Sequence, residues 1–321
     1  MESVTSSVTQ PKHVPVMLDR SIALLAPAIS RPNAIVIDAT LGLAGHSLSM
    51  LEQFPNLRLI GIDRDENALE ISRKRLANYA ERITLVHAVY DEISDVLAEL
   101  GIPAVDGVLF DLGVSSMQLD VAERGFSYNQ EAHLDMRMNN SDSLTAAEIL
   151  NTYSHGELAR IISTFGEEKF ASRIANAIVK ARETAPIETT VQLVELIKGA
   201  IPAAARRTGG NPAKRTFQAL RIEVNSELSV LERAIPQSLA ALNAGGRVVV
   251  LSYHSLEDKI VKNAFAKVST SETPIDLPIT PQKPAFELLV RGNEKPTDAE
   301  VESNPRARSV RLRAIAKAVA A

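Results

Sequence analysis

Strand-like and helix-like segments alternate through the first third of the chain, and this alternation restricts the fold more than any other feature. The strand-like segments are short β-branched or aliphatic runs at 34–38, 57–63, 82–88 and 105–111. Segments with helical periodicity, such as 65–80 and 90–101, lie between them. Strands that alternate with helices form a parallel sheet covered by helices on both faces, so we predict an α/β fold.

A different pattern occupies the middle of the chain. Only helical patterns occur over 143–201, including a capping box at 145–148 and an apolar face at Phe170, Ile174 and Ile178. Strand patterns return at 245–255, 285–290 and 307–318. We therefore expect a sheet core built from residues 1–120 and 213–321, and between them a helical insert, 121–212, that recognises the substrate.

The composition excludes several classes of protein. The chain has 321 residues, of which 45% are hydrophobic, and no apolar run is long enough to span a membrane. The first residues do not resemble a signal peptide, so we expect a cytoplasmic protein without a membrane partner. There is no cysteine, which excludes disulfides, thiolate metal sites and cysteine nucleophiles, and no metal is expected.

The first two strand ends predict a nucleoside cofactor. Gly42 and Gly45 follow the first strand, where they permit a tight turn and a close approach of the backbone to a ligand. The second strand ends at Asp63, in the position of an acid that accepts hydrogen bonds from ribose hydroxyls. Asp65 can cap the next helix and leave Asp63 for the ligand. An ordinary structural turn remains an alternative, and these residues do not identify the cofactor.

The chain resembles, over nearly its whole length, the MraW/RsmH family of S-adenosylmethionine-dependent methyltransferases. These enzymes act on the exocyclic N4 amine of a cytosine in small-subunit (16S) ribosomal RNA, near the decoding region. The matching stretches include "DATLGLAGHS" (38–47), "DLGVSSMQLD" (111–120), "ERGFSY" (123–128), "NPAKRTFQALRIEVNSEL" (211–228) and "GGRVVVLSYHSLED" (245–258).

The resemblance implies a Rossmann-like class I methyltransferase sheet with an inserted all-helical subdomain, and it implies S-adenosylmethionine as the cofactor. By the same resemblance, the cofactor contacts fall on Ala44, Gly45, His46, Asp63, Tyr90, Asp111 and Gln118. Ala44 is a departure, because the family usually has glycine at that position. The implied partner is ribosomal RNA, either free or in an assembled small subunit.

The stretch that follows the fourth strand is the best candidate for the catalytic site. Cytosine's exocyclic amine is a poor nucleophile because its lone pair is delocalised into the ring. An acceptor that holds one N–H would help, and Asp111 stands at the end of a strand where it could do so. Ser115 and Ser116 add hydroxyls for the substrate. The alternative is that Asp111 contacts the cofactor alone.

Two basic zones are candidates for RNA contact, although the net charge of the chain is −4. The first zone runs from Lys198 to Arg221 without an acid, and its six basic residues are Lys198, Arg206, Arg207, Lys214, Arg215 and Arg221. The second zone begins at Arg306 and ends at Lys317. Either zone could instead be only a solvated face. His254 is a further candidate for the substrate side, and the rings available for base stacking are Phe126, Tyr128, Phe217 and Tyr253.

Two other functions are compatible with a fold of this kind. A nucleotide-dependent dehydrogenase is disfavoured because the spacing of the glycines departs from G-x-G-x-x-G. The other is a noncatalytic RNA-binding protein with a degenerate cofactor fold, and an intact cofactor site would argue against it.

Overall fold

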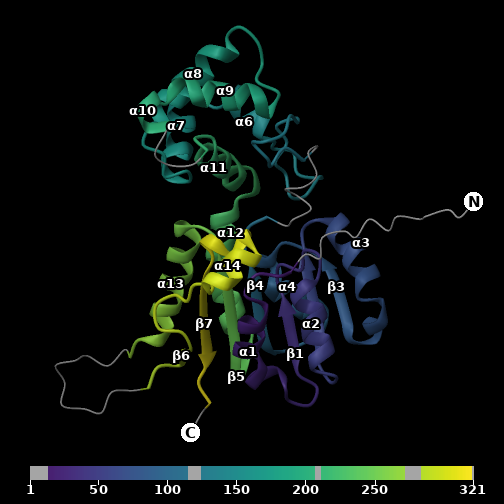
Figure 1. Cartoon of the computed structure of the whole chain (residues 1–321). Coiled ribbons are helices and arrows are strands. Elements are labelled where there is room, and N and C mark those ends of the chain that lie inside the picture. Colours follow the sequence, from purple (N-terminus) through teal and green to yellow (C-terminus); the bar gives the residue numbers. More distant parts are fainter. Residues whose placement is uncertain (1–13, 115–123, 207–210, 272–282, 320–321) are drawn as a thin grey trace, which may run out of the picture.

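The computed structural model describes residues 14–114, 124–206, 211–271 and 283–319, and its centre is a twisted sheet (Figure 1). The described strands are β1 (Ile35–Asp38), β2 (Arg58–Asp63), β3 (Ile83–His87), β4 (Val105–Asp111), β5 (Leu242–Ser252), β6 (Phe286–Leu288) and β7 (Arg311–Lys317). Their order across the sheet is β3-β2-β1-β4-β5-β7-β6. The first five are parallel, whereas β7 runs antiparallel to both β5 and β6. The predicted α/β class with a parallel sheet is confirmed.

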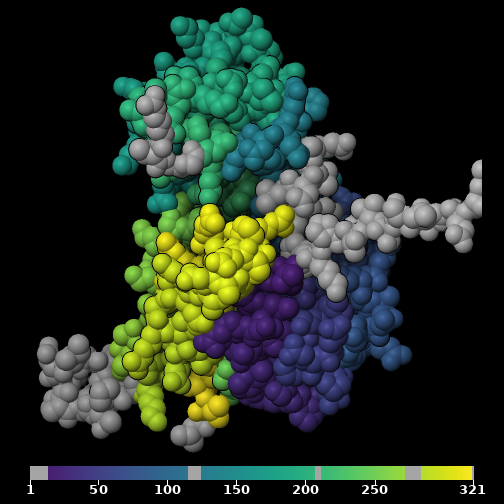
Figure 2. Space-filling view, viewed as in Figure 1, coloured from purple at the N-terminus to yellow at the C-terminus, as the bar shows by residue number. Residues whose placement is uncertain are grey.

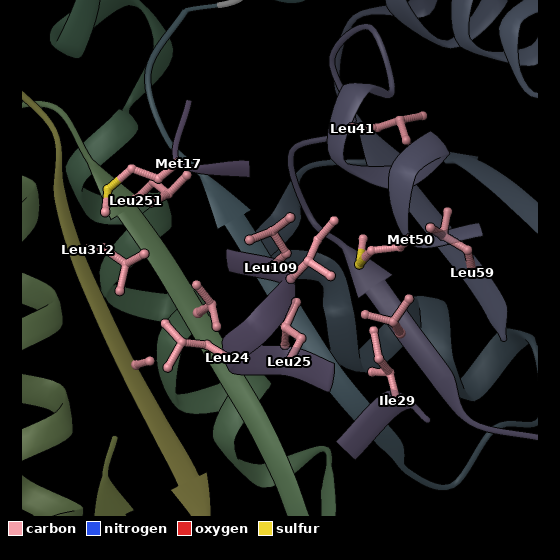
Figure 3. Close-up of a cluster of buried hydrophobic side chains, with 14 of the residues drawn as sticks. Met17, Leu24, Leu25, Ile29, Leu41, Met50, Leu59, Leu109, Leu251 and Leu312 are labelled. Carbon is pink, nitrogen blue, oxygen red and sulfur yellow. The ribbon is translucent and has the colours of Figure 1, made fainter. Parts of the chain in front are cut away.

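Helices cover both faces of this sheet. One face carries α1 (Leu18–Ile29), α2 (Gly45–Gln53) and α3 (Glu66–Arg75), and the other carries α4 (Ile93–Glu99), α12 (Glu227–Ala240) and α13 (Ser255–Ser269). Successive side chains of a strand point to opposite faces, so Leu109 packs on the α1 side while Phe110 packs against the α12 side. Figure 3 shows the α1 side, where Leu25 lies near Leu109 and Ile29 belongs to the same buried cluster.

The helical insert folds around a hydrophobic cluster of its own. Its described helices are α6 (Ala146–Thr152), α7 (His155–Thr164), α8 (Ala171–Arg182), α9 (Thr190–Ala200), α10 (Ala203–Arg206) and α11 (Lys214–Asn225). Thr145 caps α6 by accepting a hydrogen bond from the Glu148 amide, which is one of the two bonds of the predicted capping box. The predicted boundary at residue 212 needs correction, because Phe217 and Leu220 of α11 are buried in the cluster of the insert.

The insert stands on the carboxyl end of the sheet, and the molecule narrows between the two parts (Figure 2). Ser226 joins α11 to α12 in the left-handed conformation, with a φ of 53°. The guanidinium of Arg124 lies 3.1 Å from the carboxylate of Asp65, which caps α3. Arg64 of the core donates to the carbonyl of Asn225 at the end of α11. These polar contacts fix the position of the insert over the sheet edge.

Three short 3₁₀ turns and one short helix complete the described elements: η1 (Ala77–Arg82), η2 (Tyr90–Glu92), α14 (Asp298–Ser303) and η4 (Pro305–Ser309). No helix in the described ranges is long and apolar enough to span a bilayer.

Most of the second basic zone has a structural role. Asp258, on α13, accepts hydrogen bonds from Arg311 and Arg313 on β7, the latter at 2.7 Å. The ammonium group of Lys317 donates a hydrogen bond to the carbonyl of Leu242. The positive charge of the stretch looks uncompensated in the sequence, because the carboxylate that pairs with Arg311 lies 53 residues earlier in the chain. These three side chains therefore have partners within the protein, and RNA contact by the zone as a whole stays a prediction.

Candidate active site

Three parallel strands end in aspartate at the same edge of the sheet: β1 in Asp38, β2 in Asp63 and β4 in Asp111. A cavity of about 410 Å³ opens there, between the sheet edge and the insert. The sheet domain contributes Gly42, Gly45, His46, Asp63, Tyr90, Asp111, Gly113, Tyr253, His254 and Arg306 to its lining, and the insert contributes Phe126, Tyr128, Met138, Lys214, Phe217 and Arg221. This volume is within the usual range for small-molecule sites.

The turn after β1 depends on its glycines. Gly42 has a φ of 52°, which favours glycine, and a methyl group on Gly45 would come within 2.4 Å of the Pro15 side chain. Ala44 also lies in the left-handed region, with a φ of 57°, where an alanine costs about 1–2 kcal/mol relative to the right-handed conformation. Its side chain is fully buried in the core, and it does not line the cavity as Gly45 and His46 do.

Asp63 ties this turn to the end of β2. Its carboxylate accepts hydrogen bonds from the amides of Gly42, at 2.7 Å, and Asp65, at 2.8 Å. Asp65 itself caps α3 by accepting from the Asn67 amide, as the sequence predicts. Burial raises the pKa of Asp63 to about 6, although the two amides oppose this effect. Each carboxylate oxygen retains a lone pair, and Asp63 lines the cavity.

Asp38 and His46 form a buried layer beneath the cavity. Asp38 accepts a hydrogen bond from the Ser47 hydroxyl at 2.6 Å, and burial raises its pKa to about 6. The Nε2 atom of His46 lies 3.1 Å from the carbonyl of Val16, which makes Nε2 the donor and leaves Nδ1 as the acceptor in the neutral ring. Desolvation lowers the pKa of His46. Asp38 and Ser47 were not identified as site residues from the sequence, where they look like part of an ordinary strand end and helix start.

Asp111 is the carboxylate best placed for chemistry. The hydroxyl of Tyr253 donates to its Oδ1 at 2.7 Å, and the Nδ1 of His46 lies 3.7 Å from its Oδ2. Its side chain is 26% exposed, and it lines the cavity. Burial raises the pKa of Asp111 to about 7, and the hydrogen bond from Tyr253 opposes this rise. A carboxylate with a pKa near neutrality can accept a proton and release it again.

Aromatic side chains from both parts of the molecule surround the cavity. Tyr128 and Phe217 of the insert meet edge to face, with ring centroids 5.7 Å apart. On the sheet side, Tyr90 makes a similar contact with Phe110 at 5.7 Å. Phe126 lines the cavity and also belongs to the hydrophobic cluster of the insert, and its contact with a base stays a prediction.

His254 belongs to a buried cluster of polar side chains that includes Glu257, Glu227 and Arg221. It caps α13, and its Nε2 lies 3.2 Å from the carboxylate of Glu257. Glu227, His254 and Glu257 bring three potential metal ligands within 4.8 Å of one another. However, Arg221 donates two hydrogen bonds to Glu227, both at 2.8 Å, so its guanidinium already supplies a positive charge at this cluster. We therefore interpret the cluster as an ion-pair network.

The predicted substrate residues are only partly brought together. Lys214 and Arg306 line the cavity from the insert and from η4, respectively. Arg215 donates to the carbonyl of Glu167, and Arg206 ends α10. Ser115, Ser116, Gln118 and Arg207 lie outside the described residues.

A sheet of this order, with a glycine turn after β1, an acid at the end of β2 and a cavity above both, defines a Rossmann-like α/β enzyme that binds a nucleoside cofactor. Within that class, the profile of the MraW methylase family matches residues 10–318. The chain therefore belongs to the MraW methylase family, and it uses S-adenosylmethionine as methyl donor. This assignment excludes the dehydrogenase alternative.

Curated relatives match almost the full length of the chain. A protein of Streptomyces avermitilis is 58% identical over 308 residues, which covers 95% of this chain and 97% of the relative. A protein of Thermobifida fusca is 58% identical, covering 95% and 93%, and one of Nocardia farcinica is 54% identical, covering 97% of each. All three are named "Ribosomal RNA small subunit methyltransferase H".

Solved structures show a more distant likeness. The crystal structure of an rRNA methylase from Streptococcus thermophilus has a TM-score of 0.44 at 12% identity, and it covers 95% of this chain and 99% of its own. A protein from Streptococcus mutans, solved in complex with SAH, has a TM-score of 0.43 at 14% identity, with the same coverage of 95% and 99%.

The lining of the cavity fits a cofactor that carries a ribose and a purine. Asp63 presents carboxylate lone pairs, and the Gly42 turn leaves space that a side chain would fill. Tyr90 and Leu41 supply apolar surface beside them. These groups are the kinds of contact that nucleoside cofactors require.

We expect Asp63→Ala to bind S-adenosylmethionine at least about tenfold more weakly, because a charge-assisted hydrogen bond contributes about 1.5–3 kcal/mol. Affinity for the parent should also fall as the pH drops through about 6, where Asp63 becomes protonated. Isothermal titration calorimetry at several pH values measures both effects. The exposed Asp19→Ala is the matched control, and equal affinities for the two variants would contradict the role of Asp63.

Proposed function

We propose that this protein transfers a methyl group from S-adenosylmethionine to the exocyclic N4 amine of a cytosine in small-subunit (16S) ribosomal RNA, near the decoding region. The observation that carries the proposal is the position of Asp111, a partly exposed carboxylate in a cavity that has the cofactor edge of the sheet on one side and aromatic residues of the insert on the other. The names of the curated relatives support small-subunit ribosomal RNA as the substrate. The expected location is the cytoplasm.

The residues that would hold the cofactor surround the ends of β1, β2 and β4. We assign Asp63 to the ribose hydroxyls, Tyr90 to the purine, and Gly45 and His46 to the turn that faces the cofactor. Ala44 contributes through the backbone of the same turn, and Gln118 stays a prediction outside the described residues. When bound, S-adenosylmethionine supplies a methyl group on a positively charged sulfur.

Asp111 is assigned two tasks in the reaction. As an acceptor for one N–H of the amine, it directs the nitrogen lone pair out of conjugation with the ring and towards the methyl group. When the nitrogen gains its new bond to carbon, it has a surplus proton, and Asp111 Oδ2 is the atom that takes it. A carboxylate with a pKa of about 7 can do so and then release the proton to solvent.

The base needs a pocket outside the RNA stack. Tyr128, Phe217 and Tyr253 line the cavity and offer ring faces or edges to a base that is turned out of the strand. His254 lines the same cavity at the start of α13 and is assigned to the substrate side. Ser115 and Ser116 are proposed to contact the substrate, as the sequence predicts. The absence of cysteine argues against methylation at carbon 5 of the ring, which needs a cysteine nucleophile.

Basic side chains are proposed to position the phosphate backbone at the mouth of the cavity. Lys214 is the first residue of α11, and Arg206 is the last residue of α10. Arg207 and Arg215 belong to the same stretch, and Arg306 of η4 lines the cavity from the sheet domain. Phosphate contacts of this type position RNA without reading its sequence.

The direct test is mass mapping of small-subunit ribosomal RNA from cells with and without this protein. We expect one cytosine to lose a mass of one methyl group when the protein is absent, and the methyl group to return with a plasmid-borne copy. Fragmentation that places the lost methyl on a ribose, or on another base, would contradict the N4 assignment while leaving methyl transfer intact.

We expect the double variant Arg206→Ala, Lys214→Ala to bind the RNA with a weaker dependence on salt. Each lost phosphate contact should reduce the slope of log affinity against log salt by about 0.7–0.9. Affinity for the cofactor should be unchanged. The control is Lys74→Ala, which removes an exposed cation on α3. A slope equal to that of the control would contradict RNA contact by these two residues and indicate that they only face solvent.

We expect Asp111→Asn to lower the rate of methyl transfer by about 10²–10³, because the amine loses both its orientation and its proton acceptor. The rate should be measured in a single turnover with enzyme and S-adenosylmethionine saturating, so that weaker binding does not contribute. A rate within about threefold of the parent would contradict the catalytic role, and Asp111 would then be a cofactor contact alone.

A further inference from the structure

Among the described residues, Tyr253 is the one whose side chain donates a hydrogen bond to the carboxylate of Asp111. Tyr253 follows β5, the strand that pairs with β4, so residues distant in the sequence meet at neighbouring strand ends. The phenol donates to Oδ1 at 2.7 Å, whereas Oδ2 faces the Nδ1 of His46 at 3.7 Å, beyond hydrogen-bond distance. The two oxygens of one carboxylate therefore have different surroundings.

We infer that Tyr253 is a positioning residue for methyl transfer: its hydroxyl holds Asp111 by Oδ1, so that Oδ2 is the oxygen presented to the target amine. This inference rests on the proposed function and extends it to a residue that had been considered only as a ring for base stacking. Tyr253 acts through Asp111, while Asp111 makes the contact with the amine.

The surroundings of Tyr253 hold the phenol in this role. Its backbone amide donates to the carboxylate of Glu257 at 2.8 Å, which fixes the start of α13 against the end of β5. The ring lies close to Gly113, where an added methyl group would come within 3.5 Å of it. The backbone on one side and Asp111 on the other leave the ring little freedom. Burial and the neighbouring carboxylates raise the pKa of Tyr253 well above its ordinary value, so the phenol stays protonated and remains a donor.

The hydrogen bond also affects when Asp111 is ionised. The groups that face Asp111 are Asp38 at the end of β1, His46 on α2, Tyr253 after β5 and Glu257 on α13. Burial and Glu257 raise the pKa of Asp111, whereas the phenol lowers it because it donates to the ionised form. Asp111 must be ionised to accept the proton of the amine, so activity should rise with pH through the pKa of Asp111. Loss of the phenol should move this rise to higher pH.

The experiment is the pH profile of the single-turnover rate for the parent and for Tyr253→Phe, with enzyme and S-adenosylmethionine saturating. We expect the inflection of the variant to lie about one to two pH units above that of the parent, because hydrogen bonds to charged groups are typically of that strength. Well below both inflections, the variant should be at least about tenfold slower than the parent, and the gap should narrow as the pH rises.

Two variants serve as controls. Tyr153→Phe removes a phenol that also donates to a carboxylate, that of Glu223 at 3.1 Å, but within the insert and outside the cavity lining. It should keep the pH profile of the parent. Asp111→Asn should lose the inflection, because the group that titrates is gone.

The outcomes separate this inference from the proposed function. If the parent fails to methylate the N4 amine, the proposed function is wrong whatever Tyr253 does. If the parent is active and Tyr253→Phe has the inflection of the parent, or is slower by the same factor at every pH, the positioning role is wrong. Weaker binding of S-adenosylmethionine by the variant, without a shifted inflection, would likewise reject it.

Discussion

The active site depends on the burial of carboxylates at one edge of a parallel sheet. Asp38, Asp63 and Asp111 each end a strand, and burial raises the pKa of all three. Removing a charge from water is costly unless hydrogen bonds replace the lost solvation. Here the replacements are a serine hydroxyl and the Thr40 amide for Asp38, two amides for Asp63 and one phenol for Asp111. Asp111 accepts a single such bond from the described residues, and it is the acid to which the proposed chemistry is assigned.

The sheet edge forms only half of the cavity, and the insert forms the other half. The insert has its own hydrophobic cluster, so it can fold as a unit that polar contacts then place over the core. Arg124 reaches the buried Asp65, and Arg64 reaches the end of α11. Asp65 lies two residues after Asp63, so the ion pair between Arg124 and Asp65 is formed beside the residue assigned to the cofactor.

Charge patterns in the sequence were the least reliable guide to the site. The run from Arg306 to Lys317 contains no acid, yet Asp258 on α13 pairs with Arg311 and Arg313 of β7. Arg221 looks like a member of the first basic zone but is paired with Glu227. Lys214 and Arg306 both line the cavity although they lie far apart in the sequence. Charge balance depends on three-dimensional neighbours, which a one-dimensional count does not contain.

The sequence by itself determined the α/β class, the glycine turn and the acids at the ends of the first strands, because strand–helix alternation and strand ends are local patterns. It also contained the motifs that indicate the family. Only the tertiary structure decided that Tyr253 binds Asp111, that α11 belongs to the insert, and that His254 joins a buried ion-pair network. These facts arise from the pairing of β4 with β5 and from the docking of the insert, and such contacts between distant segments leave no periodic signal in the chain.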